Sequence, residues 1–440
     1  MNWRQRYRFQ LYVRNSLWIL PALSIVAALI AASLLTGYEE AVGSRANISA
    51  ETARAVMSTV ASSTFTLVVL LSSALLLAVQ LASAQLTPRI IAMVYRNRYQ
   101  KAAFALFVFT FTFSTSVLAR IETSAPRIAS YAAAYGFLLN LGLFIFLIDN
   151  VGKMLRPSSA VAVVARSGRT VIRNVYPLPL KEDSTSPAPI SAITDEEPRA
   201  VLSAADGAVL AFDLNGLVNL AHRHNCLIEL VPEVGQWVAA GDPLFRVYHG
   251  GRQLTDDMLR NSIAQGSERT PEQDPLFAFR ILVDIASKAL SPAINDPTTA
   301  VLAIDQIHHL LHDLGKRFLG DGREMDRTGQ LRLIYRTPNW EDFVQIGTTE
   351  IRQYGRDSIQ VQRRLRAMLK DLVNTLAPRR APVLQKELSL LATSSKRTFP
   401  DLDDQTLAES GDLQGIGGSY EDQYEPVMSP EPLEMERKPE

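Results

Sequence analysis

The sequence predicts a membrane α-helical protein with four transmembrane helices, followed by a small β-barrel or sandwich and an α-helical cytoplasmic domain. Two observations carry this prediction. The first is a set of four long apolar segments, almost free of charge, within the first 156 of the 440 residues. The second is a change of period further along, where short β-branched runs bounded by glycine give way to amphipathic helices after residue 250.

A transmembrane domain is predicted for residues 1–156. Its spans cover about residues 16–36, 56–86, 102–119 and 128–148, and each is close to or longer than the roughly 20 apolar residues that a helix needs to cross a bilayer. Arginine and lysine are concentrated before the first span, after the second and after the fourth. The positive-inside rule therefore places both termini in the cytoplasm.

The second span is too long for a simple crossing and carries polar residues on one face. As one helix it would rise roughly 50 Å, so we expect it to project beyond the membrane. Its polar residues recur at near-heptad spacing. They form a polar seam made of Thr59, Ser62, Thr66, Ser73 and Gln80. Two interpretations stay open: the seam lines a water-filled path in a homo-oligomer, or its small polar groups hold membrane helices together.

Residues 157–198 are rich in serine, proline and alanine, and they are predicted to form a strand and then a linker. For residues 199–250 the short runs predict a small β-barrel in which Gly235 and Gly241 occupy tight turns. The string around these glycines is similar to the hairpin of biotinyl and lipoyl carrier domains. No lysine occupies the turn that carriers modify, so we expect a spacer or an oligomer contact.

Residues 251–395 show the apolar periodicity of amphipathic helices and are predicted to form the helical cytoplasmic domain. Two proline-marked helix starts stand out. Thr270 is expected to cap one helix with Pro271 at its first position, and Asp296 to cap the next with Pro297 following. These two helices should pack as a hairpin.

The last residues, 396–440, are acidic and lack periodicity, so they are predicted to form a disordered tail. The whole chain has zero net charge, which gives no reason to expect nucleic acid as a partner. Cys226 is the one cysteine, so an intramolecular disulfide is excluded.

A cytoplasmic polar cluster surrounds the two helix starts. Its members are Arg269, Asp274, Asp284, Asn295 and Asp296. The three aspartates supply a divalent-cation or acid–base site if they meet, because hard cations bind several oxygens from neighbouring elements. The alternative is helix capping with buried ion pairs, in which Arg269 or Lys288 pairs with Asp284. No nucleophile stands beside a base, so we expect no enzymatic activity.

A second candidate metal site lies on the following helix. Asp305, His309 and His312 stand at i, i+4 and i+7, on one helix face. The same pattern is typical of a polar stripe opposite an apolar face, and one helix seldom supplies a complete metal site. We expect no cofactor.

Three long strings carry a resemblance to one family. They are LASAQLTPR at residues 81–89, GSERTPEQD at 266–274 and LVDIASKALSPAINDPTTA at 282–300. With these strings the chain, over roughly residues 1–395, resembles the bacterial predicted membrane proteins of domain of unknown function 2254. The resemblance implies an inner-membrane protein with four spans and a cytoplasmic part, and it implies no established activity.

Together these features predict a homo-oligomeric channel or transport-type protein of the bacterial inner membrane, with a cytoplasmic domain that regulates or assembles it. Its expected partners are the lipid bilayer and further copies of the chain. The alternative is a membrane-anchored sensor or scaffold that binds a ligand and transports nothing.

Overall fold

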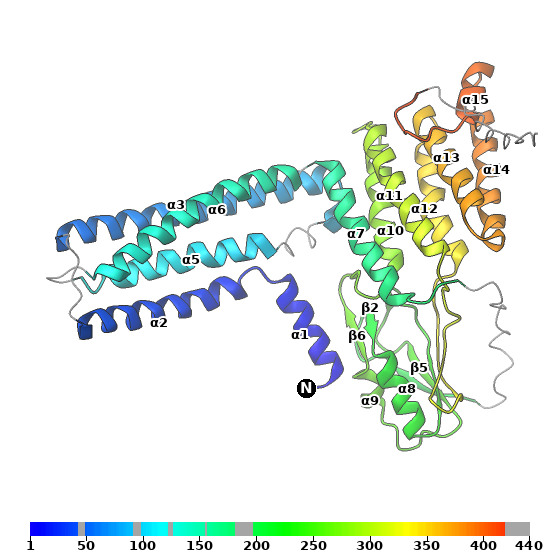
Figure 1. The fold of residues 1–440 in the computed structure, drawn as a ribbon. Coiled ribbons are helices and arrows are strands. Elements are labelled where there is room, and N and C mark those ends of the chain that lie inside the picture. Colours follow the sequence, from blue (N-terminus) through cyan, green and yellow to red (C-terminus); the bar gives the residue numbers. More distant parts are fainter. Residues whose placement is uncertain (43–48, 91–97, 122–125, 155, 181–196, 419–440) are drawn as a thin grey trace, which may run out of the picture.

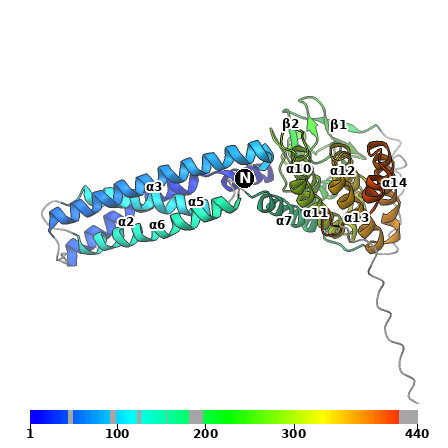
Figure 2. The same ribbon diagram turned by 90° about the horizontal axis from the view of Figure 1, so that it is seen from above.

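The computed structural model describes residues 1–42, 49–90, 98–121, 126–154, 156–180 and 197–418. The molecule divides into a long helical bundle and a wider assembly of sheets and helices at one end of that bundle (Figure 1). The view from above shows the same division, with the bundle extending away from the assembly (Figure 2).

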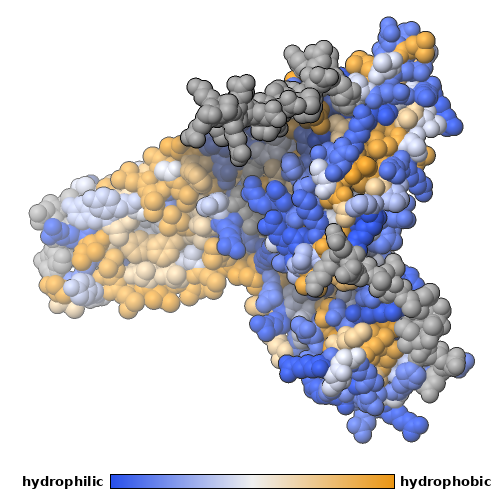
Figure 3. Space-filling model, turned by 45° about the vertical axis from the view of Figure 1, so that its right-hand side comes forward, coloured by the Kyte–Doolittle hydropathy of each residue, from blue (hydrophilic) through white to orange (hydrophobic). Residues whose placement is uncertain are grey.

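Four helices of the described residues are long and apolar enough to cross a membrane, as the sequence predicts. They are α2 (Ile19–Val42), α3 (Ala50–Gln85), α5 (Arg98–Leu118) and α6 (Arg127–Met154). Large apolar side chains such as Leu23, Leu138 and Ile145 are exposed on the outside of these helices. Figure 3 shows a mainly hydrophobic surface over the bundle, which is typical of helices surrounded by lipid.

The first helix, α1 (Trp3–Asn15), precedes the bundle and packs elsewhere. Its Trp3, Tyr7 and Leu11 lie against Ala208 and Leu210 of the sheets. The N-terminus and the part of the chain that follows the bundle therefore lie at the same end of it (Figure 1).

The length of α3, 36 residues, lets it reach beyond the bundle into the assembly. Leu75, Val79 and Leu86 near its C-terminal end belong to the same buried core as the helical domain. A short 3-10 turn, η1 (Pro88–Ile90), follows directly. The second span thus projects past the other spans' apolar core, as its length predicts.

The helical domain contains six helices within residues 275–409, all of which are described. They are α10 (Pro275–Ala289), α11 (Pro297–Gly315), α12 (Trp340–Tyr354), α13 (Ile359–Thr375), α14 (Ala381–Thr398) and α15 (Leu402–Glu409), with a 3-10 turn η3 (Pro378–Arg380) before α14. The predicted hairpin is present as α10 packed against α11. Their apolar faces meet α12 and α13 in one core that includes Phe279, Ile304, Phe343 and Leu365.

The start of α11 is as predicted, and the start of α10 is shifted. Asp296 caps α11 by accepting the N–H of Thr299 at 3.0 Å. The helix α10 begins at Pro275 instead of Pro271, and Asp274 caps it through the N–H of Phe277. Both starts therefore use the same Asp-Pro pair, in which the carboxylate satisfies a free N–H and proline needs none.

The strand predicted for the first part of residues 157–198 is a helix instead, α7 (Pro157–Val175). Val161 and Val164 lie on the buried face of this helix. Helical spacing buries them because α7 packs between α10 and α11. A side chain at Gly168 would place its Cβ 2.8 Å from the Cβ of Ala278, so glycine permits this close approach.

The strands form two open sheets where a barrel was predicted. Within the continuously described residues 197–418, a five-stranded sheet has the order β1-β5-β3-β8-β7 and a three-stranded sheet the order β4-β2-β6. The strands are β1 (Arg199–Leu202), β2 (Gly207–Phe212), β3 (Leu227–Leu230), β4 (Trp237–Val238), β5 (Pro243–Tyr248), β6 (Ile263–Gly266), β7 (Arg323–Met325) and β8 (Leu331–Tyr335). The helices α8 (Leu214–Arg223) and α9 (Asp256–Arg260) lie among them.

Pairing between distant segments explains why the barrel prediction was wrong. β8 lies in the region predicted to be helical, yet it pairs parallel with β3 and places Ile228 opposite Leu333. β8 therefore extends the sheet beyond β3, at the edge through which a barrel would have to close. β6, beyond the predicted boundary at residue 250, pairs antiparallel with β2 in the three-stranded sheet. The turns at Gly235 and Gly241 do form, with φ of +88° and +92°.

Part of the predicted disordered tail is folded. Beyond α14 and α15, residues 410–418 pack on α13, where Asp412 is 3% exposed and accepts the N–H of Gly415 and of Gly417. These contacts are polar, so apolar periodicity could not reveal them. The rest of the predicted tail, 419–440, and most of the predicted linker, 181–196, lie outside the described residues.

Candidate functional site

The polar seam lies on the outside of the bundle. Every residue of the seam is exposed, whereas the opposite face of α3, with Met57, Leu67 and Leu71, is buried in the bundle core. Within one chain the seam is therefore not the surface through which α3 packs on α5 and α6. It remains available to another molecule.

The seam hydroxyls bond back to their own helix. Thr59, Ser62, Thr66 and Ser73 each donate to the carbonyl oxygen four residues earlier, at 2.8 to 3.0 Å. This satisfies the donor and leaves oxygen lone pairs directed outward. Gln80 makes no such bond to any described residue, so its amide is the least satisfied group of the seam.

A second polar set, which the sequence did not reveal, lies inside the bundle. We call it the inner polar layer and define it as Thr64, Thr110, Ser114 and Asn140. Thr64, Ser114 and Asn140 are 0% exposed. In the described part of the chain, the two hydroxyls and both polar atoms of the Asn140 side chain lack a hydrogen-bond partner.

The inner polar layer separates two apolar clusters of the bundle. Along α3, Thr64 lies between Met57 of one cluster and Leu67 of the other. Along α6, Asn140 lies between Ala133 and Leu147 in the same manner. Because α3, α5 and α6 pack side by side, the layer occupies one level of the bundle.

α5 and α6 come close together beside this level. A Cβ added at Gly136, one turn from Asn140, would lie 3.5 Å from the Oγ1 of Thr110. The two helices therefore approach without a large side chain between them, as small residues permit in membrane bundles.

Asp284, from the predicted polar cluster, lies where α3 meets α10. Its carboxylate forms ion pairs with Arg89, just after α3, and with Arg280, at 2.6 Å. Arg280 also binds both carboxylate oxygens of Glu350 on α12, at 2.5 and 2.6 Å. The Nζ of Lys288 donates to the carbonyl oxygen of Ser83 at 2.8 Å. We call this set the α3–α10 contact.

The other members of the predicted cluster lie elsewhere. Arg269 donates to the carboxylate of Asp274 at 2.6 and 2.8 Å, at the start of α10 beside the sheets. Asn295 has a φ of +49° in the turn that precedes α11, and Asp296 caps that helix. The three aspartates are thus engaged in separate places. The predicted cap is confirmed for Asp296, whereas Asp274 caps α10 in place of Thr270. The ion pair of Asp284 uses Arg280 and Arg89 in place of Arg269 or Lys288.

Asp305, His309 and His312 do not form a metal-binding group with other described residues. Asp305 accepts a hydrogen bond from Nε of Arg364 at 2.6 Å, and His308 lies 2.8 Å from the carboxylate of Asp371. Among the described residues, no group of three or more His, Cys, Asp or Glu side chains is placed to hold a metal ion.

Burial and neighbouring charges shift the pKa values of two carboxylates in these contacts, Glu350 and Asp274. Hydrogen bonds from Arg280 lower the pKa of Glu350, which keeps the α3–α10 contact ionised at neutral pH. Burial raises the pKa of Asp274, and the adjacent Arg269 offsets part of that rise. The Asp274 carboxylate therefore depends on Arg269 to remain charged.

These features define the class of the molecule, a membrane protein with four candidate spans joined to a mixed sheet and helical assembly. The chain belongs to the family described as predicted membrane protein (DUF2254), whose profile matches residues 14–371. This agrees with the resemblance carried by the three sequence strings.

Relatives of this chain come from mycobacteria. An uncharacterized protein of Mycobacterium bovis and one of Mycobacterium tuberculosis are each 24% identical to the chain over 415 residues. Each match covers 90% of this chain and 79% of the relative. No solved structure matches the chain.

Proposed function

We propose that this protein is a homo-oligomeric channel or transport-type protein of the bacterial inner membrane, with both termini and the helical domain in the cytoplasm. The polar seam is the observation that carries the proposal. It follows α3 on the outside of the bundle, and Gln80 at its end has no partner among the described residues of the same chain. Polar groups on the outside of a membrane helix need a polar partner or water. Seams of neighbouring copies that face one another around a water-filled path meet this need.

The helical domain regulates or assembles the protein in this proposal. The α3–α10 contact supports that role because Asp284 and Lys288 bind the chain at the end of α3. A displacement of α10 therefore acts on the helix that carries the seam. The proposal contains no enzymatic step and needs no cofactor.

Ion flux and oligomeric mass test the proposal together. The protein is purified in detergent for a mass measurement and reconstituted into liposomes for flux, as wild type, Thr66→Leu and Gln80→Leu. Both variants should lose flux while keeping the oligomeric mass, because an apolar side chain in the path removes the groups that replace an ion's hydration.

The matched control is Ser72→Leu. Ser72 is exposed on the same helix and bonds back to the carbonyl of Val68 at 2.7 Å, but it lies off the seam. It should keep both flux and mass. A monomer, or seam variants that conduct as well as wild type, would contradict the proposal.

A membrane-anchored sensor is the second candidate function. It is favoured by a polar pocket in the helical domain, lined by arginine and hydroxyl side chains, which is described below. A sensor predicts that Thr66→Leu and Gln80→Leu are tolerated. Substitution of Arg397, which lines this pocket, should then weaken ligand binding.

A further inference from the structure

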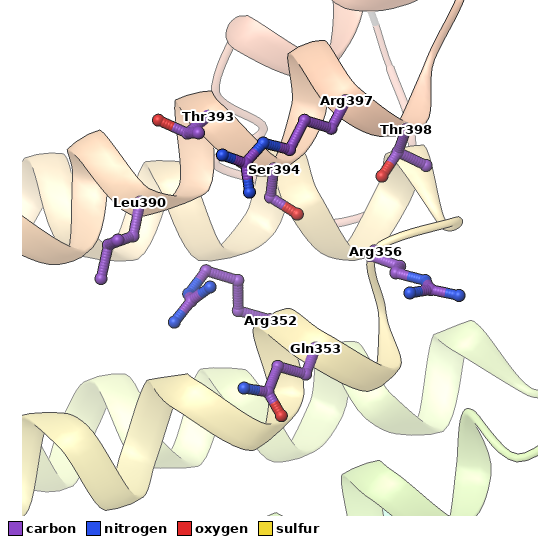
Figure 4. A pocket seen from close by; sticks show the side chains of 8 residues that line it. All are labelled: Arg352, Gln353, Arg356, Leu390, Thr393, Ser394, Arg397 and Thr398. Carbon is purple, nitrogen blue, oxygen red and sulfur yellow. The ribbon is translucent and has the colours of Figure 1, made fainter.

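A pocket with a volume of about 390 Å³ opens between the C-terminal ends of α12 and α14. We call it the arginine pocket. Its lining residues are Arg352, Gln353, Arg356, Leu390, Thr393, Ser394, Arg397 and Thr398. Figure 4 shows Arg352 of α12 and Arg397 of α14 extending into the space between the two helices from opposite sides.

Several arginines of the helical domain bind carboxylates, whereas Arg397, which is exposed at the pocket, binds none among the described residues. Arg280, Arg317 and Arg364 each bind a carboxylate on a neighbouring residue or helix. Arg397 makes no hydrogen bond or ion pair with any described residue. Two like charges that point into one pocket repel each other, so the arrangement favours an anion between them.

The negative groups near the pocket do not balance its three guanidinium groups. Glu387 lies 3.4 Å from Arg352 and is buried, and Asp357 lies 3.5 Å from Arg356 at the exposed edge. The C-terminal end of each helix adds a partial negative charge of about half an electron. None of these groups contacts Arg397, which therefore remains free to bind an anion.

Hydroxyl groups complete the set of donors. Ser394 and Thr398 lie on the pocket wall and form no hydrogen bond with the described residues, so both can donate to a ligand. Guanidinium groups bind phosphate through two parallel hydrogen bonds, and hydroxyls add single ones. From this chemistry we propose that the arginine pocket binds a soluble phosphate-bearing small molecule.

The size and place of the pocket narrow the ligand class. Small-molecule sites commonly span about 300 to 1,000 Å³, so the pocket has room for more than one phosphate group or for a phosphate with an organic part. α14 lies on the side of the helical domain away from the spans (Figures 1 and 2). A ligand from solution therefore reaches the pocket more directly than a lipid headgroup does.

Phosphate binding in this pocket does not depend on whether the protein transports anything. Calorimetric titration of the full-length protein in detergent tests the proposal. The probes are inorganic pyrophosphate and adenosine diphosphate at low salt. Wild type should bind at least one of them, and Arg397→Ala should weaken that binding about tenfold or more, as the loss of a charge-assisted hydrogen bond predicts. The affinity of Arg397→Lys should lie between those of wild type and Arg397→Ala, because lysine keeps the charge but cannot form two parallel hydrogen bonds.

Two controls separate binding from folding. Arg397→Ala should retain the thermal unfolding midpoint of the free protein, because Arg397 has no partner among the described residues. Arg223→Ala removes an exposed arginine on α8 and should bind as wild type does. Absence of binding by wild type, an unchanged affinity in Arg397→Ala, or an equal loss in Arg223→Ala would overturn the proposal.

Discussion

The bundle and the helical domain both bury polar side chains, but they treat them differently. In the helical domain, Arg363 is 1% exposed and donates to the carbonyl oxygens of Gly417 and Gly418. In the bundle, Asn140 and Thr64 are as fully buried and have no partner among the described residues. A buried polar group without a partner costs free energy, more so in a medium of low dielectric constant. The paired burial of Arg363 thus stabilises the helical domain, whereas the unpaired burial of Asn140 and Thr64 costs the bundle free energy.

The largest expected effect comes from Arg363→Ala. The substitution removes a buried side chain and leaves two carbonyl oxygens unpaired, so we expect the free energy of unfolding to fall by about 3 kcal/mol. The segment 410–418 should detach from α13. Thermal unfolding and limited proteolysis measure the two effects, with Arg223→Ala as the exposed control. A variant as stable and as protected as wild type would show that this arginine is not what holds the segment.

Asn140→Leu tests the bundle, where the substitution is expected to raise stability instead of lowering it. Leucine is close to asparagine in size and needs no hydrogen bonds, so the variant should be about 1 to 2 kcal/mol more stable than wild type. The measurement is the thermal unfolding midpoint in detergent. A less stable variant would mean that the amide has a partner, such as bound water, in the folded protein.

A matched substitution in the helical domain sharpens the contrast. Asp305→Leu makes the same kind of change at a paired carboxylate and leaves Arg364, 8% exposed, without its carboxylate partner. Its stability should fall. If Asn140→Leu and Asp305→Leu shift the unfolding midpoint in the same direction, the distinction between the two regions is lost.

The smallest expected effect is a pH dependence at His308. Burial lowers the pKa of His308, although the hydrogen bond to Asp371 opposes the shift and Arg364 adds to it. The unfolded chain therefore binds the proton at a higher pH than the folded chain, and stability decreases as the pH falls below about 6.5. His308→Gln should make the thermal unfolding midpoint change less with pH between pH 7.5 and 5.5. His224→Gln, beside the sheets, is the control. If it reduces the pH dependence of the unfolding midpoint as much as His308→Gln does, His308 is not the cause of that dependence.

Local signals predicted the four spans, the length of α3, and the α10–α11 hairpin. The Asp296-Pro297 start was also predictable because a cap and its helix are consecutive in the chain. The polar seam could be predicted because its residues recur at near-heptad spacing in the sequence. Asn140 was missed, although an amide within an apolar span was the available signal.

Contacts between distant residues were not predictable in this way. The partner of Asp284 was expected to be Arg269 or Lys288, which are close in sequence, but one partner is Arg89 at the end of α3. The arginine pocket depends on two helix ends that are 45 residues apart, Arg352 and Arg397. Neither pairing leaves a pattern in consecutive residues.

The sequence by itself determined that the chain has four apolar spans, one of them long and polar on one face, and helices with defined starts. These properties follow from hydrophobic length and period, which consecutive residues fix. Only the tertiary structure decided that β8 joins β3, that the valines of α7 face a helical core, and that the seam faces outward. Such choices depend on the free energy of packing segments far apart in the chain, where the same local pattern is compatible with several partners.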